Sequence, residues 1–275
     1  MTLRRMMLGK RLEELREQAG VSREDVAAEL DCTPGRVRHL ESGRNLPTRP
    51  DVLVMCNMYD VPTDVRDALL ETRSEAQQAG WWQTYRLPKW LASYVMLEAD
   101  ATLVRNWEVE LIPGLLQTEQ YARRIATIGD LNFTGAEVEK RVSARLRRQD
   151  RLTDQNNPLR LEALISEAAI QRCAAEPDIA PEQLNNLLKV GELPNVNIQI
   201  VPMNLGMHHA MAGGFALLAF PPDTWPQTGY QEYNVGGHLV DDPEAVNSLG
   251  KLFDALQERA LTVPDSARLI LQYIG

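Results

Sequence analysis

The chain has 275 residues, of which 44% are hydrophobic and 24% charged, and its formal net charge is −9. These are the fractions of an ordinary folded protein long enough for two domains, and the acidic balance argues against a protein that coats nucleic acid. The charge is unevenly divided, because residues 1–49 carry ten Lys/Arg and eight Asp/Glu while residues 50–275 carry nineteen and thirty. A neutral-to-basic head on an acidic body suits a DNA binder that makes few phosphate contacts.

Three cysteines lie far apart, at Cys32, Cys56 and Cys173. Their odd number and wide spacing suggest neither a disulfide framework nor a zinc ribbon, and a reducing cytoplasm fits best. No apolar segment follows the N-terminal arginines as a secretion signal requires, and the longest apolar run, residues 215–220, is too short to span a bilayer. We expect a soluble, cytoplasmic protein with no metal or other cofactor.

Apolar residues at helical spacing predict a first helix from about Leu8 to Ala19. A short second helix follows Ser22, which can cap its free N–H groups, with Asp25 in the reciprocal capping-box position. The apolar edge of this helix is formed by Val26, Ala27 and Leu30.

A third helix is predicted after a two-residue turn. Thr33 is a good N-cap, and Pro34 fits the first helical position, where its missing N–H is no loss. Gly43 ends the helix because it can adopt the left-handed conformation that follows a C-cap. Steps of 100° per residue place Val37 and Leu40 on the inner face.

The segment 20–47 therefore predicts a helix-turn-helix whose second helix enters a DNA major groove. Arg38 has the donor fork that a guanine edge accepts, and Gly35 removes bulk where the backbone comes close. Arg23 lies at a helix N-terminus suited to a phosphate. The expected DNA contacts are Ser22, Arg23, Thr33, Pro34, Gly35, Arg36, Arg38, His39, Ser42, Arg44 and Asn45.

This segment resembles the lambda-repressor-like, or xenobiotic-response-element, family of bacterial regulators. The resemblance is carried by the pattern Gly20-Val21-Ser22-x-x-x-Val26-Ala27-x-x-Leu30-x-Cys32-Thr33-x-x-x-Val37-x-x-Leu40-Glu41-x-Gly43-x-x-x-Pro47. The pattern departs from the family at Asp31, where glycine or asparagine is more usual, although Asp tolerates the left-handed region. An ordinary helical hairpin with coincident caps is the alternative.

Two further helices complete the expected bundle, one over Asp51–Asp60 and one from Pro62 to about Gln78. The sequence therefore predicts an all-α DNA-binding domain over residues 1–79.

Three of the five tryptophans follow Gly80, within residues 81–90. Such aromatic density is typical of a core or of a contact between domains. A ligand cleft or a protein interface is the alternative, because large aromatic side chains also anchor interfaces. We expect Trp82, Tyr85 and Trp90 at or behind a contact with a protein partner.

Strands and helices alternate without a strict rhythm in residues 80–275, which predicts an α+β domain with one mainly antiparallel sheet. The predicted strands cover residues 103–111, 159–165, 196–202, 215–220, 230–235 and 238–240. The predicted helices cover residues 91–101, the segment after Thr118, and residues 134–152, 167–173, 181–190, 243–260 and 264–273.

The helix predicted after the capping box of Thr134 and Glu137 is rich in arginine. A solvated helix face is one interpretation of this charge run, and an acidic partner or a second phosphate contact is the other. The arginines are Arg141, Arg145, Arg147, Arg148 and Arg151.

The run Leu111-Ile112-Pro113-Gly114-Leu115-Leu116-Gln117-Thr118-x-x-Tyr121-Ala122 resembles the uncharacterised C-terminal domain of a large group of bacterial regulators. The resemblance extends over roughly residues 81–272. In that group the gene often lies beside one for a small partner protein of unknown function, and no enzymatic activity is established for the domain, so the resemblance implies a context rather than a chemistry.

The catalytic signatures G-x-S-x-G, H-E-x-x-H, G-x-x-x-x-G-K-[ST], G-x-G-x-x-G and C-x-x-C are absent from the sequence. His208-His209, and His238 with Asp241 and Asp242, could form metal or catalytic loops. Adjacent histidines point to opposite sides of an extended chain, however, and Asp242 is expected to cap a helix. Turns are therefore the simpler interpretation, and we expect no catalytic or metal site.

Two functions from different classes follow from these patterns. The first is a sequence-specific, DNA-binding transcriptional regulator, expected to be a homodimer, whose C-terminal domain oligomerises and binds a small protein partner or a ligand. The second is an enzyme or toxin-like effector whose N-terminal module regulates its own promoter. Turnover of a substrate by the C-terminal domain would favour the second function, and salt-sensitive footprints on an operator would favour the first.

Overall fold

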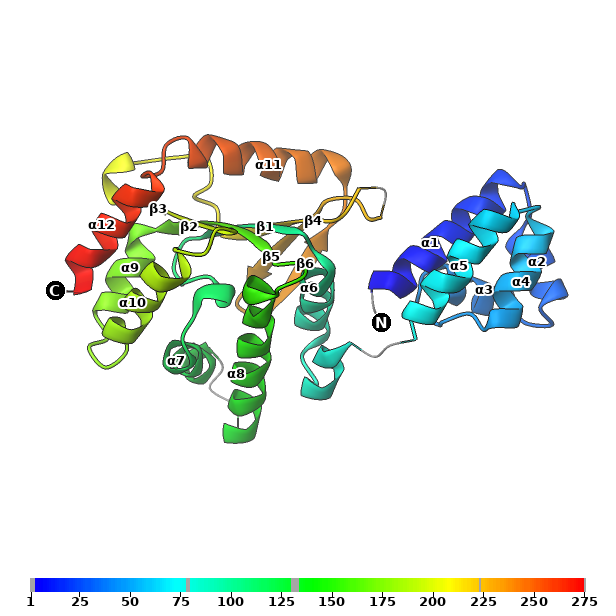
Figure 1. Cartoon of the computed structure of the whole chain (residues 1–275), viewed down its shortest axis with the longest axis horizontal. Helices are drawn as coiled ribbons and strands as arrows, with labels where there is room; N and C mark the ends of the chain where they lie inside the picture. Colours follow the sequence, from blue (N-terminus) through cyan, green and yellow to red (C-terminus); the bar gives the residue numbers. More distant parts are fainter. Residues whose placement is uncertain (1–2, 78–79, 130–133, 223, 275) are drawn as a thin grey trace. The chain divides into compact units, whose positions relative to one another are not determined.

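The computed structural model of the protein describes residues 3–77, 80–129, 134–222 and 224–274. The chain divides into two compact units, Met1–Gln83 and Thr84–Gly275 (Figure 1). Each unit has a hydrophobic core of its own. None of the helices in the described ranges is long and apolar enough to cross a membrane.

The first unit is a bundle of helices. It consists of α1 (Leu3–Gln18), α2 (Arg23–Glu29), α3 (Pro34–Glu41), α4 (Arg49–Met58) and α5 (Thr63–Glu75). Each helix turns an apolar face inward, and core residues from the first four include Leu8, Leu12, Val26, Val37 and Met55. The expected all-α bundle is confirmed, and α1 begins earlier than the leucine spacing predicts.

Local capping explains where α2 and α3 begin and end. The Ser22 hydroxyl accepts from the Asp25 N–H at 3.1 Å, and the Asp25 carboxylate accepts from the Ser22 N–H at 3.2 Å. The Thr33 hydroxyl accepts from the Arg36 N–H at 3.3 Å. Asp31 and Gly43 have left-handed φ values of 47° and 68°. These caps and both left-handed positions confirm the sequence predictions.

Helices α1 and α3 approach each other so closely that only glycine fits at the contact. A Cβ atom on Gly9 would lie 2.6 Å from the Leu40 carbonyl oxygen, and closer still to that of Glu41. On Gly43 it would lie 2.7 Å from the Arg5 carbonyl oxygen. The position of α3 therefore depends on backbone contacts with α1.

The second unit is built on a six-stranded sheet with the order β3-β2-β1-β4-β5-β6. Its strands are β1 (Leu103–Glu108), β2 (Arg160–Ser166), β3 (Val196–Val201), β4 (Phe215–Ala219), β5 (Thr228–Tyr233) and β6 (Gly236–Val240). The α+β class is confirmed. The sheet is mixed rather than purely antiparallel, because β2 pairs in parallel with both β1 and β3, while the other three pairings are antiparallel.

Helical crossovers are the reason for the parallel pairs. The path from β1 to β2 includes α7 and α8, and the path from β2 to β3 includes α9 and α10. Such segments return the chain to the end of the sheet where the previous strand began, as a parallel pairing requires.

The α-helices of this unit are α6 (Lys89–Asp100), α7 (Glu119–Gly129), α8 (Gly135–Gln149), α9 (Glu167–Ala174), α10 (Ala180–Val190), α11 (Pro243–Gln257) and α12 (Val263–Ile274). Among the described residues, 3₁₀ helices cover Trp81–Tyr85, Gly114–Leu116, Asp150–Thr153 and Met203–Leu205.

The two faces of the sheet are covered differently. Figure 1 shows α11 on one face and α6, α7 and α8 on the other. Trp107, Leu217 and Phe253 pack together beneath α11, and the Arg105 guanidinium lies 4.2 Å from the centre of the Phe253 ring. Because side chains alternate along a strand, Asn106 and Glu108 of β1 point to the opposite face.

We expect Gly9→Ala to lower the free energy of unfolding of the first unit by about 1–3 kcal/mol, since the added methyl group meets backbone carbonyl groups that cannot rotate away. Gly35→Ala is the matched control, because a Cβ atom there meets nothing closer than 3.7 Å. The control should leave stability unchanged or raise it by up to about 1 kcal/mol. Urea unfolding of the full chain measures both, and equal effects would contradict a tight contact at Gly9.

Candidate nucleic-acid interface

The outward face of α3 is slim and polar. Val37 and Leu40 are buried beneath it, as predicted from the helical spacing. Gly35, Arg38 and Ser42 are exposed on the opposite side. The first half of α3 therefore presents backbone and small side chains, with one long donor side chain beyond them.

Arg38 is available for binding. In the part of the chain that the structure describes, its guanidinium has no hydrogen-bond or ion-pair partner. Arg44 and Asn45 are exposed just beyond the end of α3, and the Arg44 guanidinium lies 3.4 Å from Nε2 of the half-buried His39. Arg38 and Arg44 can therefore both turn toward DNA without breaking an ion pair.

Arg36 has a structural partner. Its guanidinium donates to the Asp51 carboxylate at 2.8 Å, which joins α3 to α4. A hydrogen bond with the Cys32 side chain and the contact with Asp51 raise the pKa of Arg36 above its ordinary value. Burial alone would raise the pKa of Asp51, but hydrogen bonds from Thr48 and Arg36 lower it. Arg36 is therefore held at the edge of the interface.

Arg23 belongs to a buried charge cluster that the sequence patterns did not reveal. The Glu41 side chain is 2% exposed and accepts from Arg16 and Arg23, each at 2.5 Å. Arg23 also donates to Glu13 at 2.5 Å. These contacts tie the end of α3 to α1 and to the first residue of α2. A signal was present, because Glu41 shares the inner face of α3 with Val37 and Leu40.

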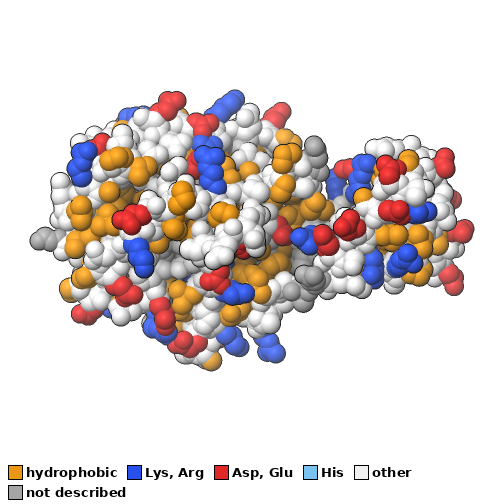
Figure 2. Space-filling model, viewed as in Figure 1, with side chains coloured by type: hydrophobic (Ala, Val, Ile, Leu, Met, Phe, Trp, Pro, Cys, Tyr) orange, Lys and Arg blue, Asp and Glu red, His pale blue; other side chains and the backbone are white. Residues whose placement is uncertain are grey.

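The predicted DNA contacts thus fall into two groups. The half-buried ones are Ser22, Arg23, Arg36 and His39. The exposed ones are Thr33, Pro34, Gly35, Arg38, Ser42, Arg44 and Asn45. On the visible face of the first unit, side chains of both signs are interspersed without one large basic patch (Figure 2).

The aromatic segment divides between core and surface. Trp82 is 7% exposed, and its ring meets that of Trp81 edge to face with centroids 6.0 Å apart. Tyr85 and Trp90 are half-buried, and Trp90 lines a cavity of the second unit. Trp82 is therefore buried, whereas Tyr85 and Trp90 keep accessible surface.

The histidine pairs have local, structural contacts. His208 packs edge to face on Trp107 with ring centroids 5.7 Å apart, and His238 lies near the Tyr233 ring. Asp242 accepts from the Ala245 N–H at 2.9 Å and caps α11, as predicted. Across the described ranges, no three His, Cys, Asp or Glu side chains are grouped so that they could hold a metal ion.

Two protein families match separate parts of the chain. Residues 91–272 match the family described as "Domain of unknown function (DUF5753)", and residues 7–69 match the family described as "Helix-turn-helix domain". The expected combination of a helix-turn-helix head with an uncharacterised C-terminal domain is confirmed. No curated protein matches the sequence. A crystal structure of ComR from Streptococcus suis is 13% identical over 70% of each chain, with a TM-score of 0.22.

We expect Glu41→Ala to lower the free energy of unfolding of the first unit by about 3–5 kcal/mol, because it leaves two arginines without their shared buried partner. Glu29→Ala, on the exposed end of α2, is the matched control and should change stability by less than about 0.5 kcal/mol. Thermal and urea unfolding of the full chain measure both. A cost as small as that of the control would show that the cluster does not hold α3.

Proposed function

Because the chain belongs to the DUF5753 family and carries a helix-turn-helix domain in front of that region, we propose that it is a sequence-specific, DNA-binding transcriptional regulator. The observation that carries the proposal is the outward face of α3. There Gly35 and Ser42 are exposed beside Arg38, whose guanidinium is unengaged within the described residues. In this proposal residues 1–79 form the DNA-binding domain and residues 80–275 the regulatory domain.

The residues of this face have different roles in DNA recognition. Arg38 offers two parallel N–H donors, which match the O6 and N7 acceptors of guanine in the major groove. Thr33, Pro34 and Gly35 let the helix N-terminus approach a phosphate or a base edge. Arg44 and Asn45 contact the DNA backbone and set the register of the helix. Arg23 and Arg36 assist mainly by fixing α3, because each is held by a carboxylate.

The charge distribution favours selective rather than general DNA binding. Residues 1–49 carry a net charge of only +2, from ten basic and eight acidic residues, and the remainder of the chain is acidic. Few phosphate contacts supply little non-specific affinity. One small module also buries a limited surface, so a homodimer on a two-fold site would supply the affinity that a single head lacks.

We assign oligomerisation and binding of a small protein partner to the second unit. Tyr85 and Trp90 keep accessible aromatic surface that can anchor a contact, and Trp82 is buried. Partner binding would alter DNA affinity only by favouring one arrangement of the regulator over another. Such a regulator works where the DNA is, which in a bacterium is the cytoplasm.

Substitution of Arg38 and of Arg44 tests the proposed DNA-facing surface. Arg38→Ala should relax base preference at one position of the operator at a cost of about 1–3 kcal/mol. Arg44→Ala should weaken all sequences alike and reduce the slope of log affinity against log salt by about 1. Binding to a randomised DNA pool, followed by titrations at several salt concentrations, measures both effects. Loss of selectivity from Arg44→Ala alone would show that another face enters the groove.

Purification of the tagged full chain from its native cells tests the assignment of the second unit. We expect a dimer by light scattering, and recovery of the neighbouring gene's small product by mass spectrometry. Trp90→Ala should reduce that recovery several-fold, whereas Trp225→Ala, at a half-buried tryptophan elsewhere in the unit, should not. A monomer that recovers no small protein would contradict the assignment.

A further inference from the structure

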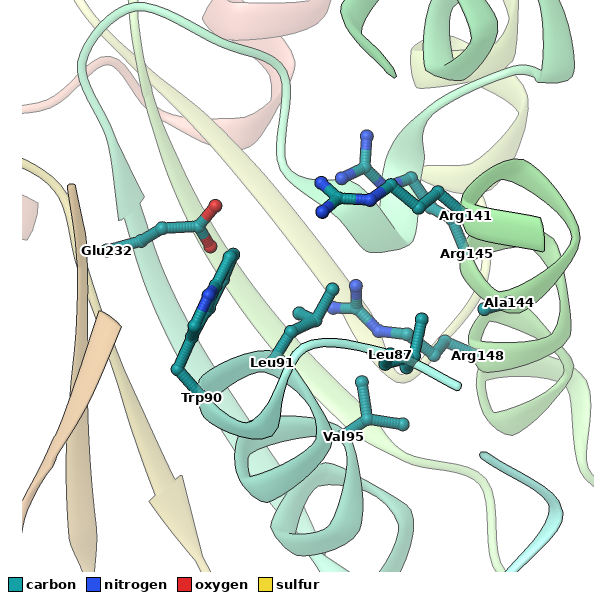
Figure 3. Close-up of a pocket in the computed structure, with 9 residues that line it drawn as sticks. All are labelled: Leu87, Trp90, Leu91, Val95, Arg141, Ala144, Arg145, Arg148 and Glu232. Atoms are coloured by element: carbon teal, nitrogen blue, oxygen red, sulfur yellow. The ribbon is translucent and has the colours of Figure 1, made fainter. Parts of the chain in front are cut away.

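The second unit contains a cavity of about 790 Å³ between the sheet and helices α6, α7 and α8. This volume lies within the range of small-molecule sites, about 300–1,000 Å³. Hydrophobic side chains surround a hollow on the visible face of this unit, with charged side chains at its edge (Figure 2). An adjoining recess shares Trp90, Leu91 and three arginines with the cavity (Figure 3).

One wall of the cavity carries positive charge. Arg141, Arg145 and Arg148 follow one another along one face of α8, and the first two extend toward the side of Glu232 in Figure 3. Arg148 is neutralised by Glu98, which it meets through two hydrogen bonds of 2.6 and 2.7 Å. Arg145 donates to the Gln117 amide oxygen at 2.7 Å, and no carboxylate in the described ranges lies within 4.0 Å of it. Burial lowers the pKa of Arg145 to about 10.

The sheet supplies negative charge from the opposite wall. Glu108 accepts from the Asn106 amide at 3.4 Å, and Glu232 accepts from the Tyr230 hydroxyl at 3.4 Å. Neither carboxylate has an ion-pair partner among the described side chains. Burial raises the pKa of Glu108 to about 7, and the nearby Glu232 carboxylate adds to this rise.

Some of the charges that line the cavity are paired, and others face each other across it. Arg148 pairs with Glu98, and Glu110 pairs with Arg172 at 2.5 Å. Arg145 then lies on the helix side, with Glu108 and the exposed Glu232 on the sheet side. Apolar residues, including Leu91, Ile112 and Ala216, also line the cavity. Partly buried charges with no close opposite charge are costly, and a ligand with matching charges would offset that cost.

We propose that this cavity binds a small zwitterion with an apolar body, of the kind that a short, free-ended apolar peptide provides. The ligand's carboxylate lies at Arg145, and its ammonium group lies at Glu108 and Glu232. A ligand with only a negative charge would be repelled by the two carboxylates. An uncharged ligand would remove water from both walls without neutralising the charge on either.

The cavity lies wholly within the second unit, so this inference goes beyond the proposed function and does not rest on DNA binding. A failure of ligand binding would leave the helix-turn-helix assignment intact. A failure of DNA binding would equally leave the ligand site intact, because the experiment below measures the ligand directly.

The probe is a set of apolar peptides of two to four residues made from Leu, Val and Phe, titrated into the full chain by calorimetry. Each peptide is compared with its N-acetylated form, its C-amidated form and the form blocked at both ends. We expect free-ended peptides to bind, and either block to weaken binding at least tenfold. The absence of binding by every free-ended peptide, or equal binding by the blocked forms, would overturn the proposal.

Substitutions in the cavity test which wall binds each end of the peptide. Glu108→Gln or Glu232→Gln should reduce the penalty of N-acetylation, and Arg145→Gln should reduce the penalty of C-amidation. Glu119→Gln and Arg147→Gln are matched controls on exposed faces of α7 and α8 and should leave both penalties unchanged. Glu232 is exposed on β5, so its variant tests the carboxylate wall even if a change at Glu108 or Arg145 impairs folding. Equal effects of controls and cavity variants would overturn the assignment.

The pH dependence of peptide affinity distinguishes binding by Glu108 from a merely structural role, which would not produce it. Below its raised pKa of about 7 this carboxyl is increasingly protonated and cannot attract an ammonium group. Affinity should therefore fall by up to about fifteen-fold from pH 7.0 to 5.5, an interval in which both peptide ends stay mainly ionised. The charged and titratable groups around Glu108 are Glu232 and Tyr230 on β5, Tyr94 on α6, Tyr121 on α7, and Arg141, Arg145 and Arg148 on α8.

Glu108→Gln should flatten this pH profile, whereas Glu119→Gln should retain it. A profile that stays equally steep in Glu108→Gln would show that another group titrates, and it would overturn the placement of the ammonium group at Glu108.

Discussion

The buried ion pair between Glu41 and Arg16, extended by Arg23, is the contact on which the first unit depends. A carboxylate that is 2% exposed has lost its water and needs positive partners in return. Those partners come from α1 and from the start of α2, so the charge requirement fixes where the last turn of α3 lies. The close approach at Gly9 fixes the same turn through the backbone. Both constraints act on the inner side of α3 and leave its outer side free for DNA.

The same requirement organises the second unit. Glu98 is 1% exposed and is paired by Arg148, which holds α8 against α6. Glu162, 8% exposed, is paired by Arg105 and Arg160. Glu108 and Arg145 depart from this pattern, since each is buried enough to shift its pKa and neither has an opposite charge close by in the described residues. Opposite charges that face each other across a cavity without pairing are the basis of the proposed ligand site.

Arginine therefore has two roles in this protein, and burial separates them. Arg16, Arg23, Arg36 and Arg148 are held by carboxylates, and their substitution would disturb the fold before it disturbed any binding. Arg38 and Arg44 are exposed and carry no ion pair within the described residues, so they can exchange water for a DNA acceptor at little structural cost. Arg145 lies between these cases, because an amide rather than a carboxylate holds it.

The sequence by itself determined most of the secondary-structure elements and the inner face of α3. The helix-turn-helix caps, the left-handed Asp31 and Gly43, the six strand segments and the inner face of α3 are all local, because caps, turns and apolar periodicity depend on residues a few positions apart. Only the tertiary structure decided the mixed sheet, since the direction of β2 depends on where α7 and α8 return the chain. It also decided that Arg148 of α8 is buried and Arg145 half-buried, contrary to the solvated-face interpretation for these two residues. It brought Glu41 to Arg16 and Glu108 to the cavity. These contacts join residues far apart in the chain. Whether a charged side chain is solvated at the surface or is buried and needs an opposite charge depends on neighbours that are distant in the sequence.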